Sequence, residues 1–321
     1  MSRITRPLLQ TLAFLLPVGG ALFLAAEAQK QRLLAVHEQA ETLLTVRVAS
    51  VEEAERLFEE LDYQWPPPAG PTVPRIAVEP LPRDLDPAMP APRKKALFFR
   101  LLLPLVLAEN RELRAQRRQL LRLLEYGGIP PEGTGARHWL DGLLQRYRVT
   151  AEDPARAVEQ LLERLDELPP ALVLAQAANE SAWGTSRFAR VANNLFGQWT
   201  WQEEHGIVPA ARPEGERYLV RKFPSLRDSV RDYFYNLNVG HAYQELRRLR
   251  REMRAAGSPL DPLALAGGLQ RYSQRGEAYV EEIRRIIRAN RLERLRDVDL
   301  MPLDAVRRLA WLWAAAGSTG G

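Results

Sequence analysis

Apolar residues recur at helical spacing through most of the chain after residue 93. The longest such pattern covers residues 95–124, and it predicts a helix that Pro104 kinks and that Gly127-Gly128 ends. Further helices are predicted over residues 135–147 and 153–168, the second opening at a capping aspartate followed by proline. Helices therefore dominate the middle of the chain.

The helical pattern continues over residues 169–183 and 187–191 and changes between residues 198 and 223. Tryptophans and β-branched residues there alternate with polar ones on either side of a turn-rich stretch at 209–215, which predicts a short hairpin. Helical spacing resumes at the capping Ser225 and continues with breaks to about residue 316. The pattern predicts a mainly α (α+β) fold with a small β-hairpin lobe.

The first residues differ from the rest. Two arginines precede an apolar run of about the length that spans a bilayer, followed by Ala26-Glu27-Ala28, and this order predicts an export signal. A cleaved signal peptide and an inner-membrane anchor both fit residues 1–28, and a buried core helix is a third alternative. The positive-inside rule places the remaining chain outside the cytoplasm, in the periplasm.

Four segments follow this predicted signal. Residues 29–64 have a helical pattern with many charges, and residues 65–95 hold a disproportionate share of the 24 prolines, which predicts an extended linker whose apolar residues could pair as an irregular strand. We expect residues 96–168 to form a helical segment that precedes a core domain over residues 169–316.

Composition excludes several chemistries. The chain has no cysteine, and its four histidines lack metal-site spacing, so we expect neither a thiolate nucleophile nor a metal or other cofactor. The net charge of +5 comes mostly from arginine and favours anionic partners without choosing among them. The densest run, residues 247–254, has the pattern of a solvated helix face. No nucleic-acid motif accompanies it, so we expect no nucleic-acid partner.

One acidic residue lies in an apolar helix. Residues 171–183 are apolar on nearly every face, which predicts a helix through the core, and Glu180 lies in its last turn. Burial and the negative end of the helix dipole both raise the pKa of a carboxyl group. A carboxylic acid protonated near neutral pH is what general-acid catalysis on a glycosidic oxygen requires. A buried ion pair with arginine is the structural alternative.

The residues around Glu180 resemble the signature of the bacterial glucosaminidase family of peptidoglycan hydrolases, and within it the Bax-like branch. The resemblance rests on Ala175 to Ala189, on Asn193-Asn194-Leu195-Phe196-Gly197, and on later matches at 223–238 and 268–279. It implies a lysozyme-like helical fold with a small β lobe across a cleft. It also implies that Glu180 protonates the oxygen that leaves N-acetylglucosamine.

The resemblance implies further roles. Tyr272 matches an aromatic residue that lines the cleft near the bond, and Trp183, Asn194 and Phe196 would shape the cleft. Trp183 and Phe196 could equally be core aromatics, and Asn193-Asn194 could be a simple turn.

The family places a second carboxylate on the hairpin lobe, where an inverting mechanism needs it to activate water. Glu204 is our choice because it belongs to the first arm of the predicted hairpin, and each candidate could instead be a solvated loop charge. Alternatively, the acetamido group of the substrate assists. The candidates are Glu203, Glu204, Glu214 and Glu216.

These observations lead to one main hypothesis, which is endo hydrolysis of the β-1,4 bond between N-acetylglucosamine and N-acetylmuramic acid in peptidoglycan glycan strands. A lytic transglycosylase would use one glutamate on the same substrate. A protein that binds the cell wall without cleaving it is the alternative from another class.

Overall fold

The structure is a computed structural model that describes residues 43–302 except 69–71, 210–211 and 213–214. These residues belong to one compact unit. The predicted signal at 1–28, the first part of the 29–64 segment, the candidate Glu214 and the chain after residue 302 lie outside the described residues.

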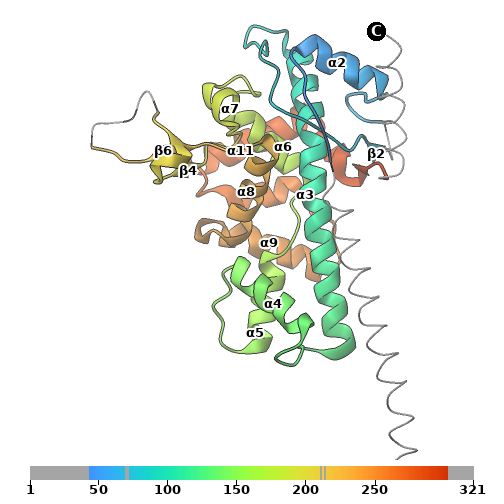
Figure 1. The fold of residues 1–321 in the computed structure, drawn as a ribbon, viewed down its shortest axis with the longest axis vertical. Helices are drawn as coiled ribbons and strands as arrows, with labels where there is room; N and C mark the ends of the chain where they lie inside the picture. The colour runs from blue at the N-terminus through green and yellow to red at the C-terminus, as the bar shows by residue number, and fades with distance from the viewer. Residues whose placement is uncertain (1–42, 69–71, 210–211, 213–214, 303–321) are drawn as a thin grey trace, which may run out of the picture. The chain divides into compact units, whose positions relative to one another are not determined.

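The described part of the chain is mainly helical, as the sequence predicts (Figure 1). Several helices begin at a residue whose side-chain oxygen accepts from the first turn, as Ser50, Thr134, Asp153, Ser186 and Ser225 do. The helices are α2 (Val51–Glu60), α3 (Ala91–Gly127), α4 (Gly135–Arg146), α5 (Pro154–Arg164), α6 (Pro170–Glu180), α7 (Arg187–Ala192), α8 (Leu226–Val239), α9 (Gln244–Ala255), α10 (Pro262–Ala266) and α11 (Glu277–Ala289).

The core lies around α3 and α6. Residues Leu101 to Ala108 of α3 are all buried, and α3 continues as one helix through Pro104 to its end at Gly127. Residues Ala171 to Ala178 of α6 are also buried on every face, because α6 packs between α3 and α11. The alanines of α6 allow its neighbours to approach closely, so Glu180 emerges from the middle of the molecule's core.

The proline-rich stretch is packed into the same unit. Strand β3 (Ile76–Val78) is buried, lies against α3 and pairs in parallel with β1 (Leu44–Val46). Strand β2 (Thr72–Val73) pairs in parallel with β7 (Asp299–Leu300). The irregular strand that the apolar residues suggest is therefore present. In the described part of the predicted helical segment before it, residues 43–64, the chain is extended at β1 and helical over α2.

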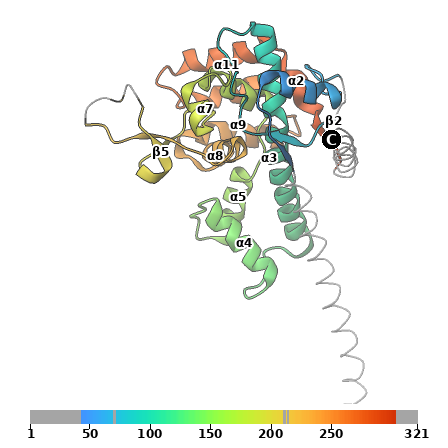
Figure 2. The same ribbon diagram turned by 45° about the horizontal axis from the view of Figure 1, so that its top comes forward.

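A small antiparallel sheet follows α7. Its order is β4-β6-β5, with β6 (Leu219–Arg221) between β4 (Trp199–Thr200) and β5 (Gly206–Ile207). We call residues 198–221 the β-lobe. It projects from the helices on the side away from α3 (Figure 2). The predicted hairpin is thus confirmed, with a third short strand that the sequence pattern did not reveal.

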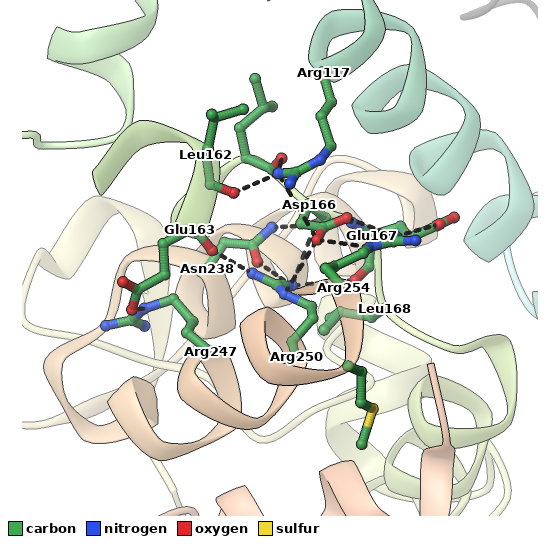
Figure 3. Close-up of polar contacts among 12 residues, drawn as sticks. Arg117, Leu162, Glu163, Asp166, Glu167, Leu168, Asn238, Arg247, Arg250 and Arg254 are labelled. Atoms are coloured by element: carbon green, nitrogen blue, oxygen red, sulfur yellow. Dashed lines mark hydrogen bonds and ion pairs between the residues drawn. The ribbon is translucent and has the colours of Figure 1, made fainter. Parts of the chain in front are cut away.

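Arginines hold the end of α5 (Figure 3). Arg250 is 1% exposed and donates to the carbonyl oxygens of Glu163 and Glu167 at 2.8 and 3.1 Å, while Arg117 donates to Leu165 at 2.9 Å. The carbonyl of Glu163 belongs to the last turn of α5 and is one that a helix end leaves without a partner, while Leu165 and Glu167 follow the helix. Helix α5 ends at Arg164, short of the predicted residue 168.

The run at 247–254 is a solvated face only in part: Arg248 and Arg251 are exposed as predicted, and the prediction is wrong for Arg247 and Arg250. The side chains of Arg247 and Arg250 are 3% and 1% exposed, and Asp166 lies among the guanidinium groups of this network. Burial alone would raise the pKa of Asp166, but the charge of Arg250 and the hydrogen bonds from Arg254 bring that pKa below its ordinary value. Burial in turn lowers the pKa of Arg250 to about 10.

Within the described residues, no helix is both long enough and apolar enough to cross a bilayer.

Candidate active site

Glu180 is the last residue of α6, and the chain turns sharply after it. Ala182, Trp183 and Gly184 all have positive φ angles of 49, 62 and 79°. Two non-glycine residues in this region store strain of about 1 kcal/mol or more each. Hydrogen bonds from Trp183 N to Ala178 O at 2.9 Å and from Gly184 N to Ser181 Oγ at 2.8 Å hold the turn. The turn thereby fixes where α6 ends and how Glu180 is presented.

The two carboxylate oxygens of Glu180 have different surroundings. Oε1 accepts hydrogen bonds from Tyr279 Oη at 2.8 Å and from Asn179 Nδ2 at 3.2 Å. Oε2 faces Gly197, where a Cβ would come within 3.7 Å of it. Because Oε1 already accepts two donors, a proton on this carboxyl group belongs on Oε2.

Burial raises the pKa of Glu180, and the hydrogen bonds from Tyr279 and Asn179 act in the opposite direction. The positive charge of Arg275 also lowers this pKa, and the negative charge of Glu282 raises it. The net direction is upward, which favours the protonated acid. The same hydrogen bonds stabilise the carboxylate that remains after the proton has been donated.

The donor to Oε1 is held by a chain of buried polar groups. Tyr233 Oη donates to Gln176 Oε1, and Gln176 Nε2 donates to Tyr279 Oη at 2.9 Å. Tyr279 has one hydroxyl proton and accepts from Gln176, so that proton is directed to Glu180. The three hydrogen bonds, from Tyr233 to Gln176, from Gln176 to Tyr279 and from Tyr279 to Glu180, all donate in the direction of the carboxylate. Oε1 of Glu180 is therefore a hydrogen-bond acceptor.

The loop beside Glu180 depends on two asparagines. Asn193 ends α7 with a φ of 52°, a left-handed conformation that asparagine tolerates. Asn194 is 2% exposed; its Nδ2 donates to Gln198 O and Arg221 O, and its Oδ1 accepts from Phe196 N and Gln198 N. Asn194 therefore joins the loop to β6 and brings Gly197 against Glu180. Both asparagines form the predicted turn, and the role of Asn194 in shaping a substrate cleft stays a prediction.

Tyr272 stacks on Tyr279, the tyrosine that donates a hydrogen bond to Glu180. The two rings stack with centroids 5.4 Å apart and an interplanar angle of 7°. Tyr272 Oη donates to Phe196 O at 2.8 Å, and Phe196 itself is buried and stacks on Tyr233 at 3.9 Å. The structure thus brings Glu180, Tyr272 and Phe196 together, with Phe196 as a core aromatic below the loop.

Trp183 points elsewhere. Its ring packs edge-on against Phe98 and Phe99 of α3 at 5.9 and 5.3 Å, and Lys95 Nζ lies 4.9 Å from its centroid. These contacts agree with the core alternative for Trp183 and give it a structural role in anchoring the turn after α6.

The candidate second carboxylates belong to the β-lobe. Glu203 and Glu204 form the short 3-10 turn η1 (Glu203–His205) between β4 and β5, and both are exposed, as is Glu216. A further carboxylate, Asp232 of α8, lies beside the lobe, where it accepts from Arg221 Nη1 at 2.6 Å and Gln198 Nε2 at 3.1 Å. Burial raises the pKa of Asp232, and the charge of Arg221 opposes that rise.

Sequence reasoning assigned no role to Gln176, Tyr279 or Gly197. A signal was present for Gln176, the one polar residue among the buried positions of α6. A buried amide requires partners, so it points to a polar network within the core. Within the described residues, no group of three or more His, Asp or Glu side chains could hold a metal ion.

Comparison with known proteins finds a family model that covers the residues of the candidate site. Residues 155–292 match the family model described as mannosyl-glycoprotein endo-beta-N-acetylglucosaminidase, the glucosaminidase family. The matched range contains α6, the β-lobe and both site tyrosines. Residues 155–292 are therefore similar to the glucosaminidase family, and the matched range covers the whole candidate site.

The chain is also similar to protein bax of Escherichia coli (strain K12). The two are 34% identical over 190 residues, which cover 59% of this chain and 66% of protein bax. The chain thus matches just under two thirds of the length of that relative. No solved structure matches the chain.

Proposed function

We propose that this protein is a peptidoglycan hydrolase, an endo-β-N-acetylglucosaminidase that uses Glu180 as its general acid. The observation that carries the proposal is the asymmetry of the Glu180 carboxyl group. Oε1 is held by Tyr279 and Asn179, burial raises the pKa, and Oε2 faces Gly197. The similarity of residues 155–292 to the glucosaminidase family supports a glycosidic bond as the target.

The first half of the reaction is a proton transfer. Oε2–H of Glu180 donates to the glycosidic oxygen that leaves N-acetylglucosamine as the C1–O bond breaks. The carboxylate left behind is stabilised by the donors on Oε1, Tyr279 and Asn179. Their hydrogen bonds are strongest in the charged state, so they favour the transition state over the ground state.

The second half requires attack on the anomeric carbon. In an inverting reaction a second carboxylate roughly 6.5–9.5 Å from the acid takes the proton of the attacking water. Glu204 on η1 of the β-lobe is our candidate for this base, and the acetamido group of the substrate is the alternative nucleophile. The Glu204→Gln variant distinguishes the two mechanisms. The rate should fall strongly if Glu204 is the base and should stay nearly unchanged if the acetamido group of the substrate assists.

The substrate also sets the compartment, because peptidoglycan lies outside the cytoplasm. We propose that the protein is exported to the periplasm through the predicted signal or inner-membrane anchor at residues 1–28. A fusion of these residues to a periplasmic reporter measures export, and a reporter that stays in the cytoplasm would contradict this part of the proposal.

The products test the reaction. Purified peptidoglycan digested with the full chain and analysed by mass spectrometry should contain fragments with new reducing N-acetylglucosamine ends. Anhydro-muramyl ends would instead establish a lytic transglycosylase. Binding to peptidoglycan without new ends would establish a wall-binding protein and reject the enzymatic proposal.

A further inference from the structure

Two tryptophans of the β-lobe are exposed. Trp199 and Trp201 are 55% and 72% exposed, more than any other large apolar side chain of the described residues. Exposing an indole ring is costly, since most of its surface is apolar. Both residues lie at the first strand of the lobe, and neither contributes to the core.

Successive side chains along a strand point to opposite faces. Trp199 and Trp201 therefore share one face, and Gln198 and Thr200 share the other. Thr200 is 9% exposed, and Gln198 turns inward to donate to Ser229 O and Asp232 of α8. Trp199 is held in place by Tyr218 of the neighbouring chain segment, with ring centroids 4.5 Å apart and planes at 11°. One face of this indole is therefore covered by Tyr218, and the ring is pre-oriented.

The position of this aromatic pair relates it to Glu180. A Cβ at Gly197 would lie 3.7 Å from Oε2 of Glu180, and Trp199 begins β4 only two residues further along the chain. Two residues span at most about 7 Å of chain, so the aromatic pair begins close to the loop that faces Glu180. A glycan strand bound with one bond at Glu180 would place a neighbouring sugar within reach of the lobe.

We propose that Trp199 and Trp201 form a binding subsite for a pyranose ring of the glycan strand, beyond the bond that is cleaved; this inference rests on the proposed function. A β-linked N-acetylglucosamine ring carries its substituents equatorially, so its faces present C–H groups. Those polarised hydrogens are attracted to the negative face of an indole ring.

The surroundings of the pair fit a sugar. Gln202, Glu203 and Glu204 are exposed next to the tryptophans, so polar groups accompany the aromatic surface. A sugar hydroxyl can use such donors and acceptors while the ring stacks. An apolar protein interface would instead call for a wide, continuous apolar patch.

The test uses the full chain carrying Glu180→Gln, so that the ligand is not consumed, and oligomers of N-acetylglucosamine from dimer to hexamer as the probe. Affinity is measured by calorimetry. We expect Trp199→Ala to weaken binding of the longer oligomers by about five- to tenfold and to leave the dimer nearly unchanged. Trp201→Ala should have the same length dependence, and Trp199→Tyr should retain most of the affinity.

Leu121→Ala is the matched control, because Leu121 is an exposed apolar residue of α3, remote from the lobe. Unchanged affinity in both tryptophan variants, an equal loss at every length, or no oligomer binding by the parent would overturn the subsite. A change of oligomeric state in Trp199→Ala without a change in glycan affinity would assign the pair to a protein interface and also overturn it. Failure of the proposed function is distinguished by its own readout, the absence of new reducing ends with the unsubstituted chain.

Discussion

Glu180 and its contacts define the site at the scale of single residues. Burial raises the pKa of the carboxyl group, whereas the hydrogen bonds from Tyr279 and Asn179 stabilise its charged form. A general acid requires both properties, because it must be protonated before the reaction and must accept a negative charge during it. The geometry assigns the two properties to different atoms of one side chain.

Replacing Tyr279 by phenylalanine tests this assignment. The hydrogen bond from Tyr279 lowers the pKa of Glu180, so its loss should raise that pKa further and move the alkaline limb of the pH–rate profile to higher pH. The maximal rate should fall by about tenfold, because the carboxylate loses a strong donor. Tyr235→Phe, which removes a hydroxyl bonded to Arg146 O, is the control and should leave the profile in place. A limb that moves to lower pH would contradict the role of Tyr279.

Gly197→Ala tests the space in front of Oε2. Gly197 has a φ of 66°, so alanine should destabilise the protein by about 1 kcal/mol. Its Cβ would also lie 3.7 Å from Oε2 and narrow the space beside the atom that we propose as the proton donor, so activity should fall. Gly257 has a φ of 64° with nothing within 4 Å, and Gly257→Ala should lose similar stability with full activity. Equal activity in both variants would reject this placement of the substrate.

At the scale of elements, arginines that are buried between helices determine where helices end. Arg117 from α3 and Arg250 from α9 donate to carbonyls at the end of α5, and Asp166 balances their charge. The hydrophobic pattern of residues 153–168 does not reveal this arrangement. An arginine counts as polar in such a pattern, so the pattern predicts that it is exposed even where the fold buries it. For that reason the sequence predicted the existence of α5 and α9 but missed the end of α5 and the burial of Arg247 and Arg250.

Asp166→Asn should therefore be strongly destabilising. The substitution leaves Arg250 buried without its countercharge, which costs about 3–5 kcal/mol. Urea unfolding monitored by circular dichroism measures the loss as a lower midpoint. Asp141→Asn removes an exposed partner of Arg137 on α4 and should hardly change the midpoint. If the two variants had the same midpoint, the network of Figure 3 would not stabilise the fold.

At the scale of the whole molecule, the stability of the core depends on pH. Glu109 of α3 is 6% exposed, and burial together with the neighbouring Glu112 raises its pKa to about 7. An acid whose pKa is raised by folding contributes stability below its unfolded pKa and loses it as pH rises through the folded pKa. The loss falls between about pH 4.5 and 7 and amounts to about 3 kcal/mol.

Glu109→Gln should remove this dependence. The amide is neutral at every pH, so the variant should melt several degrees above the unsubstituted protein at pH 8 and close to it at pH 5. Thermal melts at the two pH values measure the difference, and Glu125→Gln, an exposed position of the same helix, is the control. A variant that is less stable at pH 8 would show that Glu109 is ionised in a favourable ion pair.

Much of the architecture follows from local pattern. The helical spacing predicted α3, α4, α6 and α7 closely, and the alternation at 198–223 predicted the β-lobe. Glu180 stood out because a carboxylate in an apolar helix requires a reason. The partners of Glu180 could not be predicted in this way, because Tyr279 is 99 residues away and meets it only after α6 and α11 have packed.

The most direct measurement is the release of reducing ends from purified peptidoglycan by the full chain and by Glu180→Gln. Because the amide cannot donate a proton to the leaving oxygen, the variant should be slower by about a hundredfold or more. It should remain folded by circular dichroism, and Glu152→Gln, an exposed position remote from the site, should match the unsubstituted chain. Equal release of reducing ends by the Glu180→Gln variant and the unsubstituted chain would contradict the assignment of Glu180 as the catalytic acid.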